Sequence, residues 1–262
     1  MPEPKISIIT ICFNNLDDLR ATIQKVDSQT LKPFEHLIID GSSKPDIKNW
    51  LENNPKPNYR RWICERDKGI SDAFNKGITN ARGEVLHLHN SGDYYYDDSV
   101  LVTVSKSFSG DAYIGWLHGK YAQYRGGMWV ISGKPFEREK LYRGMRTLGH
   151  PTFFVRKELY EKHGLFSLDK KIAMDYDFLV RIADEPFAFI DRPLVYFTPG
   201  GVSDRKIKAS LDEVLQSYYH YKGFSLKALA WSWRTILVNE ITHTKLGEKL
   251  FQLKNKSKKT AV

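Results

Sequence analysis

The chain has 262 residues, of which 41% are apolar and 27% are charged, a composition that excludes a disordered chain. No apolar run reaches about 18 residues, so no membrane-spanning helix is expected, and the start shows no signal-peptide pattern. The two cysteines, Cys12 and Cys64, fall in predicted strands, which excludes a disulfide framework and fits a reducing cytoplasm.

The net charge of +9 is concentrated at one end of the chain. From residue 205 onwards there are twelve Lys and Arg against four Asp and Glu, whereas the first 204 residues hold 28 against 27. An anionic partner is therefore expected at the C-terminal segment.

Strand and helix alternate four times in the first hundred residues. Short β-branched or apolar runs predict strands, and apolar stripes at helical spacing predict the helices between them. The expected strands are 5–12, 34–39, 59–64 and 84–89, and the expected helices are 16–26, 45–52 and 70–78. This alternation predicts a mostly parallel sheet with helices on both faces.

The second half of the chain is less regular. Residues 113–146 are rich in Gly and Tyr and are interpreted as strands and loops that cover the sheet. Further strands are expected at 151–155 and 193–197, with helices at 157–163 and 173–182. After residue 205 only helices are expected, at 206–221 and 225–253, and they form a basic C-terminal extension to a domain of residues 1–205.

Polar side chains follow the predicted parallel strands, where ligands bind in sheets of this kind. Asn14, Asp40, Asp67 and Asp93 all lie at or just after strand ends. Asp93, in a Ser-Gly-Asp turn, can hold Mg²⁺ or Mn²⁺ beside the phosphates of a nucleotide; the alternative is an ordinary polar turn. Asp40 can accept a hydrogen bond from a base or ribose, or cap the next helix.

The segment 67–77 separates into an apolar and a polar stripe. Lys68 can meet a phosphate and Asp72 a ribose or base, while a solvated helix face is the alternative. His150, before a proline, can touch a diphosphate or metal, or serve as a hydrogen-bonded structural histidine.

These segments together resemble the family 2 glycosyltransferases of bacterial polysaccharide synthesis. The order and spacing of the motifs match over about residues 5–203. The matching motifs are 5–14, 40–43, 67–77, 90–93, 150–154, 174–181 and 200–203.

The resemblance implies an α/β GT-A fold and inverting transfer from a nucleotide-diphosphate sugar, with a UDP-sugar favoured, to a glycan or lipid-linked glycan. The first hundred residues are then expected to bind the donor and residues 101–205 to supply the acceptor and base half. It implies that Asp93 holds Mn²⁺ or Mg²⁺ and that the base comes from around Asp175. The expected nucleotide-sugar-binding residues are Asn14, Asp40, Asp67, Lys68, Asp72, Asn75, Asn90, Ser91 and His150.

Two positions depart from the pattern of the family. Asn90 and Gly92 stand where many members carry further carboxylates, so metal affinity is expected to depend on the donor. Met174 stands where many relatives carry an acid.

Helix phase separates Asp175 from Asp177. Residues two apart on a helix point about 200° apart, so they cannot readily face one substrate atom. Asp175 shares the inward face with Phe178 and is the predicted general base, with a helix cap as the alternative. Asp177 is expected on the surface, paired with Arg181 four residues on.

The extension combines an aromatic helix with basic residues, which suits peripheral contact with an anionic membrane at the inner face of the cytoplasmic membrane. The alternatives are packing on the catalytic domain and dimerisation. An inactive nucleotide-sugar-binding scaffold is the alternative function. A nucleic-acid-binding module and a nucleotidyltransferase fit less well, since the sequence shows neither a nucleic-acid-binding motif nor a phosphate loop.

Overall fold

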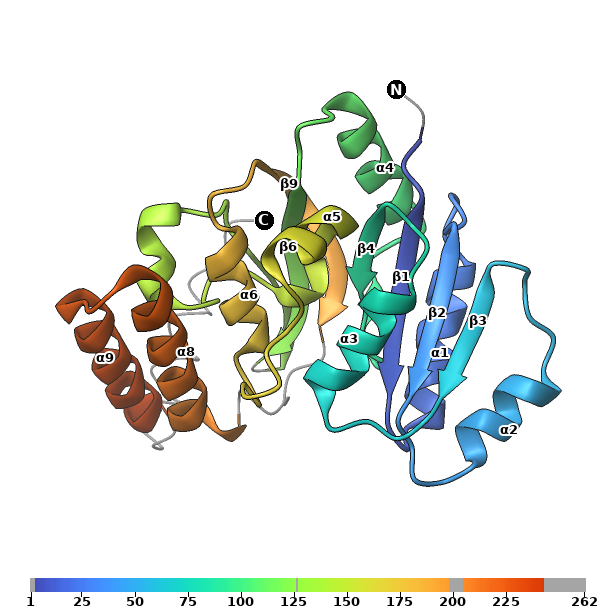
Figure 1. Ribbon diagram of the computed structural model, residues 1–262, viewed down its shortest axis with the longest axis horizontal. Coiled ribbons are helices and arrows are strands. Elements are labelled where there is room, and N and C mark those ends of the chain that lie inside the picture. Colours follow the sequence, from blue (N-terminus) through green and yellow to red (C-terminus); the bar gives the residue numbers. More distant parts are fainter. Residues whose placement is uncertain (1–2, 126, 198–204, 243–262) are drawn as a thin grey trace.

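The computed structural model describes residues 3–125, 127–197 and 205–242. Its centre is one sheet flanked by helices (Figure 1). In the described part the sheet has nine strands in the order β3-β2-β1-β4-β8-β6-β9-β5, with β7 paired to β6. The strands are β1 (Ile6–Cys12), β2 (Glu35–Asp40), β3 (Arg60–Cys64), β4 (Val85–Leu88), β5 (Tyr94–Tyr95), β6 (Trp116–Arg125), β7 (Met128–Ser132), β8 (Phe154–Arg156) and β9 (Phe187–Phe197).

Helices follow most strands. The α-helices are α1 (Leu16–Asp27), α2 (Asp46–Asn53), α3 (Ile70–Asn80), α4 (Val100–Gly110), α5 (Lys157–His163), α6 (Met174–Ile182), α8 (Ile207–Lys222) and α9 (Leu226–Thr242). Two 3₁₀ helices are η1 (Arg138–Arg143) and η2 (His150–Thr152).

The sheet has a parallel half and a mixed half. Strands β3, β2, β1 and β4 run parallel, and Cys12, Asp40 and Cys64 are aligned in neighbouring strands at their carboxyl ends. Strand β8 is antiparallel to both β4 and β6, whereas β6 and β9 are parallel. The parallel half places the strand ends that the sequence predicts as a ligand site at one edge.

Alternation along β1 builds two cores. Ile9 packs with Phe74 of α3 on one face of the sheet, while Ile8 packs with Val26 of α1 and with Val104 of α4 on the other. Both faces of the strand are therefore buried, which explains why its sequence is a continuous apolar run. In Figure 1, α3 crosses the near face and α1 lies behind the sheet.

The structure differs from the sequence prediction in four elements. The strand expected at 151–155 is shorter, because residues 150–152 form the 3₁₀ helix η2 and β8 begins only at Phe154. Strand β6 does not cover the sheet but lies inside it, between β8 and β9. Strand β9 begins at Phe187, six residues before the expected start. Helix α4, for which no prediction was made, has an apolar face buried against β1 and β4.

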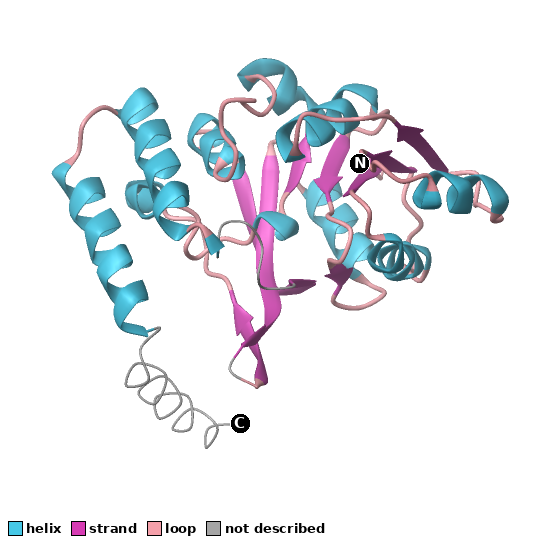
Figure 2. Cartoon of the chain, turned by 90° about the horizontal axis from the view of Figure 1, so that it is seen from below, coloured by secondary structure: helices cyan, strands magenta, loops and turns pink. Residues whose placement is uncertain are grey.

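The C-terminal helices α8 and α9 lie side by side at one end of the molecule (Figures 1 and 2). Contacts cross the boundary expected near residue 205, because α8 packs on α6 and α9 packs on η1. The part of the expected second helix after residue 242 lies outside the described residues. Among the helices of the described ranges, none has the length and hydropathy to cross a bilayer.

Candidate active site

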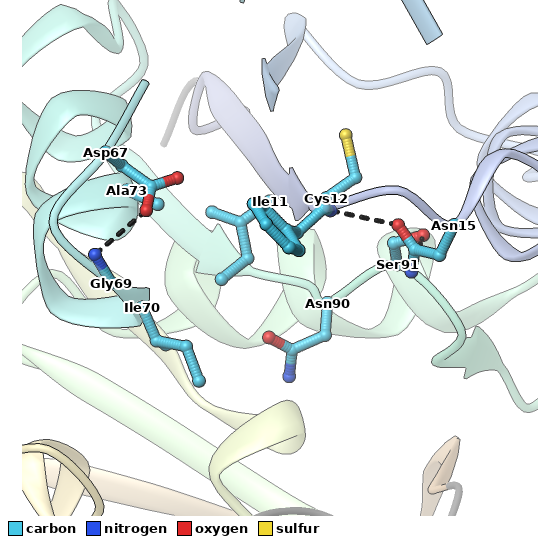
Figure 3. Close-up of a pocket in the computed structure, with 10 residues that line it drawn as sticks. Ile11, Cys12, Asn15, Asp67, Gly69, Ile70, Ala73, Asn90 and Ser91 are labelled. Carbon is cyan, nitrogen blue, oxygen red and sulfur yellow. Dashed lines mark hydrogen bonds between the residues drawn. The ribbon is translucent and has the colours of Figure 1, made fainter. Parts of the chain in front are cut away.

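The first cavity lies at the carboxyl ends of β1 and β4 and has a volume of about 560 Å³. Figure 3 shows Asp67, from the loop before α3, and Ile70, the first residue of α3, on one side of it and Asn15 with Ser91 on the opposite side. Of the predicted nucleotide-sugar-binding residues, Asp67, Asn90 and Ser91 line this cavity. Phe13, which is 62% exposed, adds an apolar ring at its edge.

Asp67 is held in place by backbone geometry. Its Oδ1 accepts a hydrogen bond from the Gly69 N–H at 2.8 Å, and the φ of Gly69 is 118°, in the region that favours glycine. A Cβ on Gly41 would lie 1.7 Å from Oδ2 of Asp67. A side chain at position 41 would therefore displace the Asp67 carboxylate from its place beside the β2 loop.

Asn15 was missed by the sequence analysis, which chose its neighbour Asn14. The amide of Asn15 donates to Ser91 Oγ at 3.0 Å and its Oδ1 accepts from the Phe13 N–H at 3.0 Å. Asn14 does not line the cavity. Its backbone N–H donates to Ser42 Oγ at 2.8 Å and its amide donates to Ser43 Oγ at 3.2 Å, which ties the end of β1 to the loop after β2. The two asparagines are adjacent and chemically identical, so the sequence does not show which of them lines the cavity.

Asp40 is buried below the floor of this cavity and does not line it. Its carboxylate lies on the α1 face of the sheet and accepts from the Ser42 N–H at 3.0 Å. The Cys12 thiol faces the same oxygen at 3.8 Å. Burial, followed by the charge of Asp40, raises the pKa of Cys64 to about 12 and raises that of Cys12 further. Neither thiol is therefore a nucleophile at neutral pH.

The other predicted binding residues of the 67–77 segment do not line the first cavity. Asp72 accepts from the Lys68 N–H at 2.9 Å and pairs with Lys76 at 3.6 Å. The Asn75 amide bonds both backbone groups of Phe166, each at 2.9 Å, and so fastens α3 to the loop before α6. Lys68, Asp72 and Asn75 are not in the lining of this cavity.

Asp93 is 4% exposed, and its Oδ2 accepts from the Asn90 amide at 3.0 Å. The pair supplies one carboxylate and one amide oxygen beside the cavity that Asn90 lines. The described residues contain no group of three His, Cys, Asp or Glu side chains that could hold a metal by themselves. This donor set fits a hard cation such as Mg²⁺ or Mn²⁺, which takes one or two carboxylates and completes its shell with substrate phosphates.

A second cavity of about 490 Å³ adjoins the first, and Ile70 and Asn90 line both. It lies between the ends of β6 and β9, the η2 turn and the start of α6. His150 and Asp175 line it, so the structure brings these two predicted residues together. Sequence reasoning missed the other polar residues of its wall, namely Tyr121, Gln123, Ser132, Arg146 and Lys171.

Asp175 sits in the first turn of α6, half-buried, and accepts from the Tyr176 N–H at 2.8 Å. Burial raises its pKa above the ordinary value of 3.8, although the charge of His150 acts in the opposite direction. Burial also lowers the pKa of His150, against the attraction of Asp175. A carboxylate with a raised pKa is a stronger base, which suits proton abstraction in this cavity.

Asp177 points away from the cavity, as the helix phase predicts, but it is not on the surface. Only 4% of it is exposed, because α8 covers this side of α6. It pairs with Arg181 at 3.2 Å and accepts from Ser217 Oγ of α8 at 2.8 Å. The expected surface pair is therefore a buried link between two helices.

Glu213 of α8 anchors the loop that leads into the helix carrying Asp175. Its carboxylate accepts from the N–H groups of Lys171, Ile172 and Ala173 at 3.0, 2.9 and 2.8 Å. Burial alone would raise the pKa of Glu213, but these three donors lower it below the ordinary 4.5. No pattern in the sequence indicates this anchor, because its partners lie about forty residues apart.

A mixed sheet thus carries a cavity of about 560 Å³ at its strand ends, and the half-buried carboxylate of Asp175 lines the adjoining cavity. Residues 7–164 match the family described as glycosyl transferase family 2, and the chain belongs to that family. An uncharacterised glycosyltransferase of Mycobacterium tuberculosis is 33% identical over 182 residues, 69% of each chain. A glycosyltransferase of Mycobacterium bovis described as acting in PGL/p-HBAD biosynthesis is 28% identical, over 71% of this chain and 72% of its own.

Solved structures share the fold. Staphylococcus aureus TarS, residues 1–349 with UDP-GlcNAc, superposes with a TM-score of 0.62 at 15% identity, over 92% of this chain and 74% of that one. The mannosyltransferase PcManGT of Pyrobaculum calidifontis, with GDP-Man and Mn²⁺, gives 0.60 at 12% identity, over 98% and 81%. The expected GT-A architecture with C-terminal helices is thus confirmed.

Proposed function

We propose that the chain is an inverting hexosyl- or N-acetylhexosaminyl-transferase that uses a nucleotide-diphosphate sugar, with a UDP-sugar favoured. The acceptor is a hydroxyl of a glycan or lipid-linked glycan. One observation carries the proposal: the cavity at the strand ends and the cavity of Asp175 adjoin at Ile70 and Asn90. A donor in the first cavity thus presents its sugar to an acceptor in the second.

The donor is held at the edge of the parallel half of the sheet. Asp67 and Asn15 face each other across the first cavity and orient the nucleoside, while Phe13 offers a ring for apolar contact. Asn90, which also lines the second cavity, and its neighbour Ser91 orient the diphosphate. These polar groups lie on rigid strand ends, which limits the entropy lost on binding.

Asp93 and Asn90 would hold Mn²⁺ or Mg²⁺. When bound, the ion neutralises charge on the departing diphosphate. The family relationship and a structural neighbour that contains Mn²⁺ support this assignment.

Asp175 acts as the general base. Its carboxylate takes the proton of the acceptor hydroxyl as that oxygen bonds to the anomeric carbon, and the bond from this carbon to the diphosphate oxygen breaks. Attack from the side opposite to the leaving group inverts the anomeric centre. General base catalysis of this kind contributes about 10²–10⁴-fold.

The test measures nucleotide release from a panel of sugar nucleotides, with and without acceptor glycans and Mn²⁺. Asp175→Asn is expected to lower transfer by about a hundredfold or more while the donor dissociation constant, measured by calorimetry, stays the same. Asp177→Asn is the matched control. It removes a carboxylate from the same helix turn, and is expected to lower the melting temperature and to leave the folded enzyme active.

Two outcomes would contradict the proposal. Transfer that survives Asp175→Asn but not Asp177→Asn would move the base to the other carboxylate. Donor binding with no release from any sugar nucleotide would favour the nucleotide-sugar-binding scaffold.

A further inference from the structure

A third cavity, of about 260 Å³, lies where α9 packs on η1 and the loop that follows it. We call it the basic pocket. Its charged lining consists of five cations and a single carboxylate, Glu137, which already pairs with Lys140. The cations are Lys134, Lys140, Arg143, Arg146 and Arg234.

Trp231 of α9 gathers three of these cations around one indole ring. The guanidinium carbons of Arg143, Arg146 and Arg234 lie 4.9, 5.1 and 5.2 Å from the ring centroid. Each contact with an aromatic face stabilises a cation modestly and fixes its direction.

No carboxylate within the described ranges pairs with Arg143, Arg146 or Arg234. Like charges held this close repel one another, and an anion between them removes the repulsion. The planar fork of N–H donors on a guanidinium group can form paired hydrogen bonds with two oxygens of a phosphate. Phosphate is therefore the anion that this arrangement of arginines suits.

The basic pocket opens towards the cavity of the general base. Arg146 and Leu148 line both the basic pocket and the cavity that contains Asp175. In contrast, no residue lines both the basic pocket and the cavity at the strand ends. A phosphate in the basic pocket is thus placed on the acceptor side of the molecule and not on the donor side.

We propose that the basic pocket binds a phosphate or diphosphate group carried by the acceptor. The inference rests on the proposed transferase function and adds the acceptor's chemical class. The pocket holds the anion against Arg143 and Arg234, Arg146 spans the junction, and the acceptor's hydroxyl extends to Asp175. The pocket selects acceptors that carry phosphate and sets the distance between that phosphate and the hydroxyl to be glycosylated.

The binding experiment uses inorganic pyrophosphate as the probe, with the donor cavity saturated by UDP. Calorimetry on the full chain is expected to show binding that the double variant Arg143→Gln/Arg234→Gln weakens at least about tenfold, or about 1.4 kcal/mol. Lys227→Gln is the matched control, since Lys227 is an exposed cation of α9 outside the pocket. It is expected to leave the affinity unchanged.

Thermal melting shows whether the double variant folds. Should it unfold, Arg143→Lys/Arg234→Lys keeps the charge and loses the fork of donors, and it is expected to bind pyrophosphate more weakly than the wild type. Phosphatidylcholine vesicles with and without phosphatidylglycerol separate a phosphate pocket from a basic membrane surface. The inference would be overturned if the wild type binds anionic vesicles but no pyrophosphate, and if the double variant no longer binds the vesicles.

The kinetic experiment distinguishes this inference from the proposed function. With phosphorylated acceptors, the double variant is expected to raise the acceptor KM about tenfold or more, with the donor KM and the rate of donor hydrolysis unchanged. If the protein binds pyrophosphate in the basic pocket but transfers no sugar, the proposed transferase function is refuted, whereas the assignment of the pocket as a phosphate site still holds. If the double variant binds pyrophosphate as tightly as the wild type, or if UDP abolishes pyrophosphate binding, the inference about the basic pocket is overturned. The proposed transferase function is not affected by either result.

Discussion

The anchor that Glu213 provides for the loop before α6 allows a quantitative prediction. Glu213→Ala removes a carboxylate that accepts from three backbone N–H groups at 2.8–3.0 Å. A hydrogen bond to a charged group contributes about 1.5–3 kcal/mol. Water reaches part of this half-buried site, so we expect a loss of about 2–3 kcal/mol in the free energy of unfolding.

For a chain of this size that loss corresponds to a fall of about 4–12 °C in melting temperature. Calorimetric melting at neutral pH measures it. Asp212→Ala is the control, because Asp212 is an exposed acid on the same helix and has no hydrogen-bond or ion-pair partner in the described part of the chain. Equal shifts for the two variants would refute the anchoring role.

Acid titration tests the same anchor independently. The pKa of Glu213 is lower in the folded chain than its ordinary value of 4.5. Its stabilisation is therefore complete above about pH 4.5 and disappears as the pH falls through the folded-state value. The stability difference between wild type and Glu213→Gln is expected to shrink over that acid range; a difference that stays constant would contradict the pKa direction.

Three further predictions concern the site. Because the pKa of Asp175 is raised, kcat/KM should fall as the pH drops through a value above 3.8, and Asp175→Asn should remove that limb of the pH–rate profile. Asp93→Asn is expected to lower turnover about a hundredfold or more, and full activity in EDTA would exclude the metal role. Gly41→Ala would place a Cβ 1.7 Å from the Asp67 carboxylate and should weaken donor binding about tenfold. Gly110→Ala is the control, because its Cβ would meet no atom within 4 Å. Equal donor affinities of the two variants in titration calorimetry would refute the steric argument.

The parallel half of the fold is predictable because β1, β2 and β4 are buried on both faces. Such strands form short, largely apolar runs in the sequence, and the ends of β1, β2, β3 and β4 fall within about one residue of their predicted positions. Strand β6 is not predictable in this way, because polar residues such as Lys120 and Gln123 interrupt its apolar sequence. Helix α4 begins Val-Leu-Val-Thr-Val, residues that favour strands in isolation, and packing decides its conformation.

The site is predictable in its positions and less so in its side-chain directions. The sequence places Asp67, Asn90 and Asp175 at the cavities, because strand ends and helix starts can be read from the pattern. The sequence cannot show that the side chain of Asp40 lies on the α1 face of the sheet and does not line the cavity. A one-residue change of register moves every side chain of a strand to the other face. Nor can the sequence show the burial of Asp177, which depends on how α8 docks.

The bonds from α8 to α6 also set an order of events during synthesis. The helix that carries Asp175 ends at residue 182, whereas Glu213, which anchors the loop before it, and Ser217, the partner of Asp177, lie more than thirty residues later. Domains tend to fold as units while the chain leaves the ribosome. A nascent chain that already contains the residues of both cavities therefore lacks these bonds to its base-bearing helix until α8 has emerged, and catalytic competence is expected only after that point.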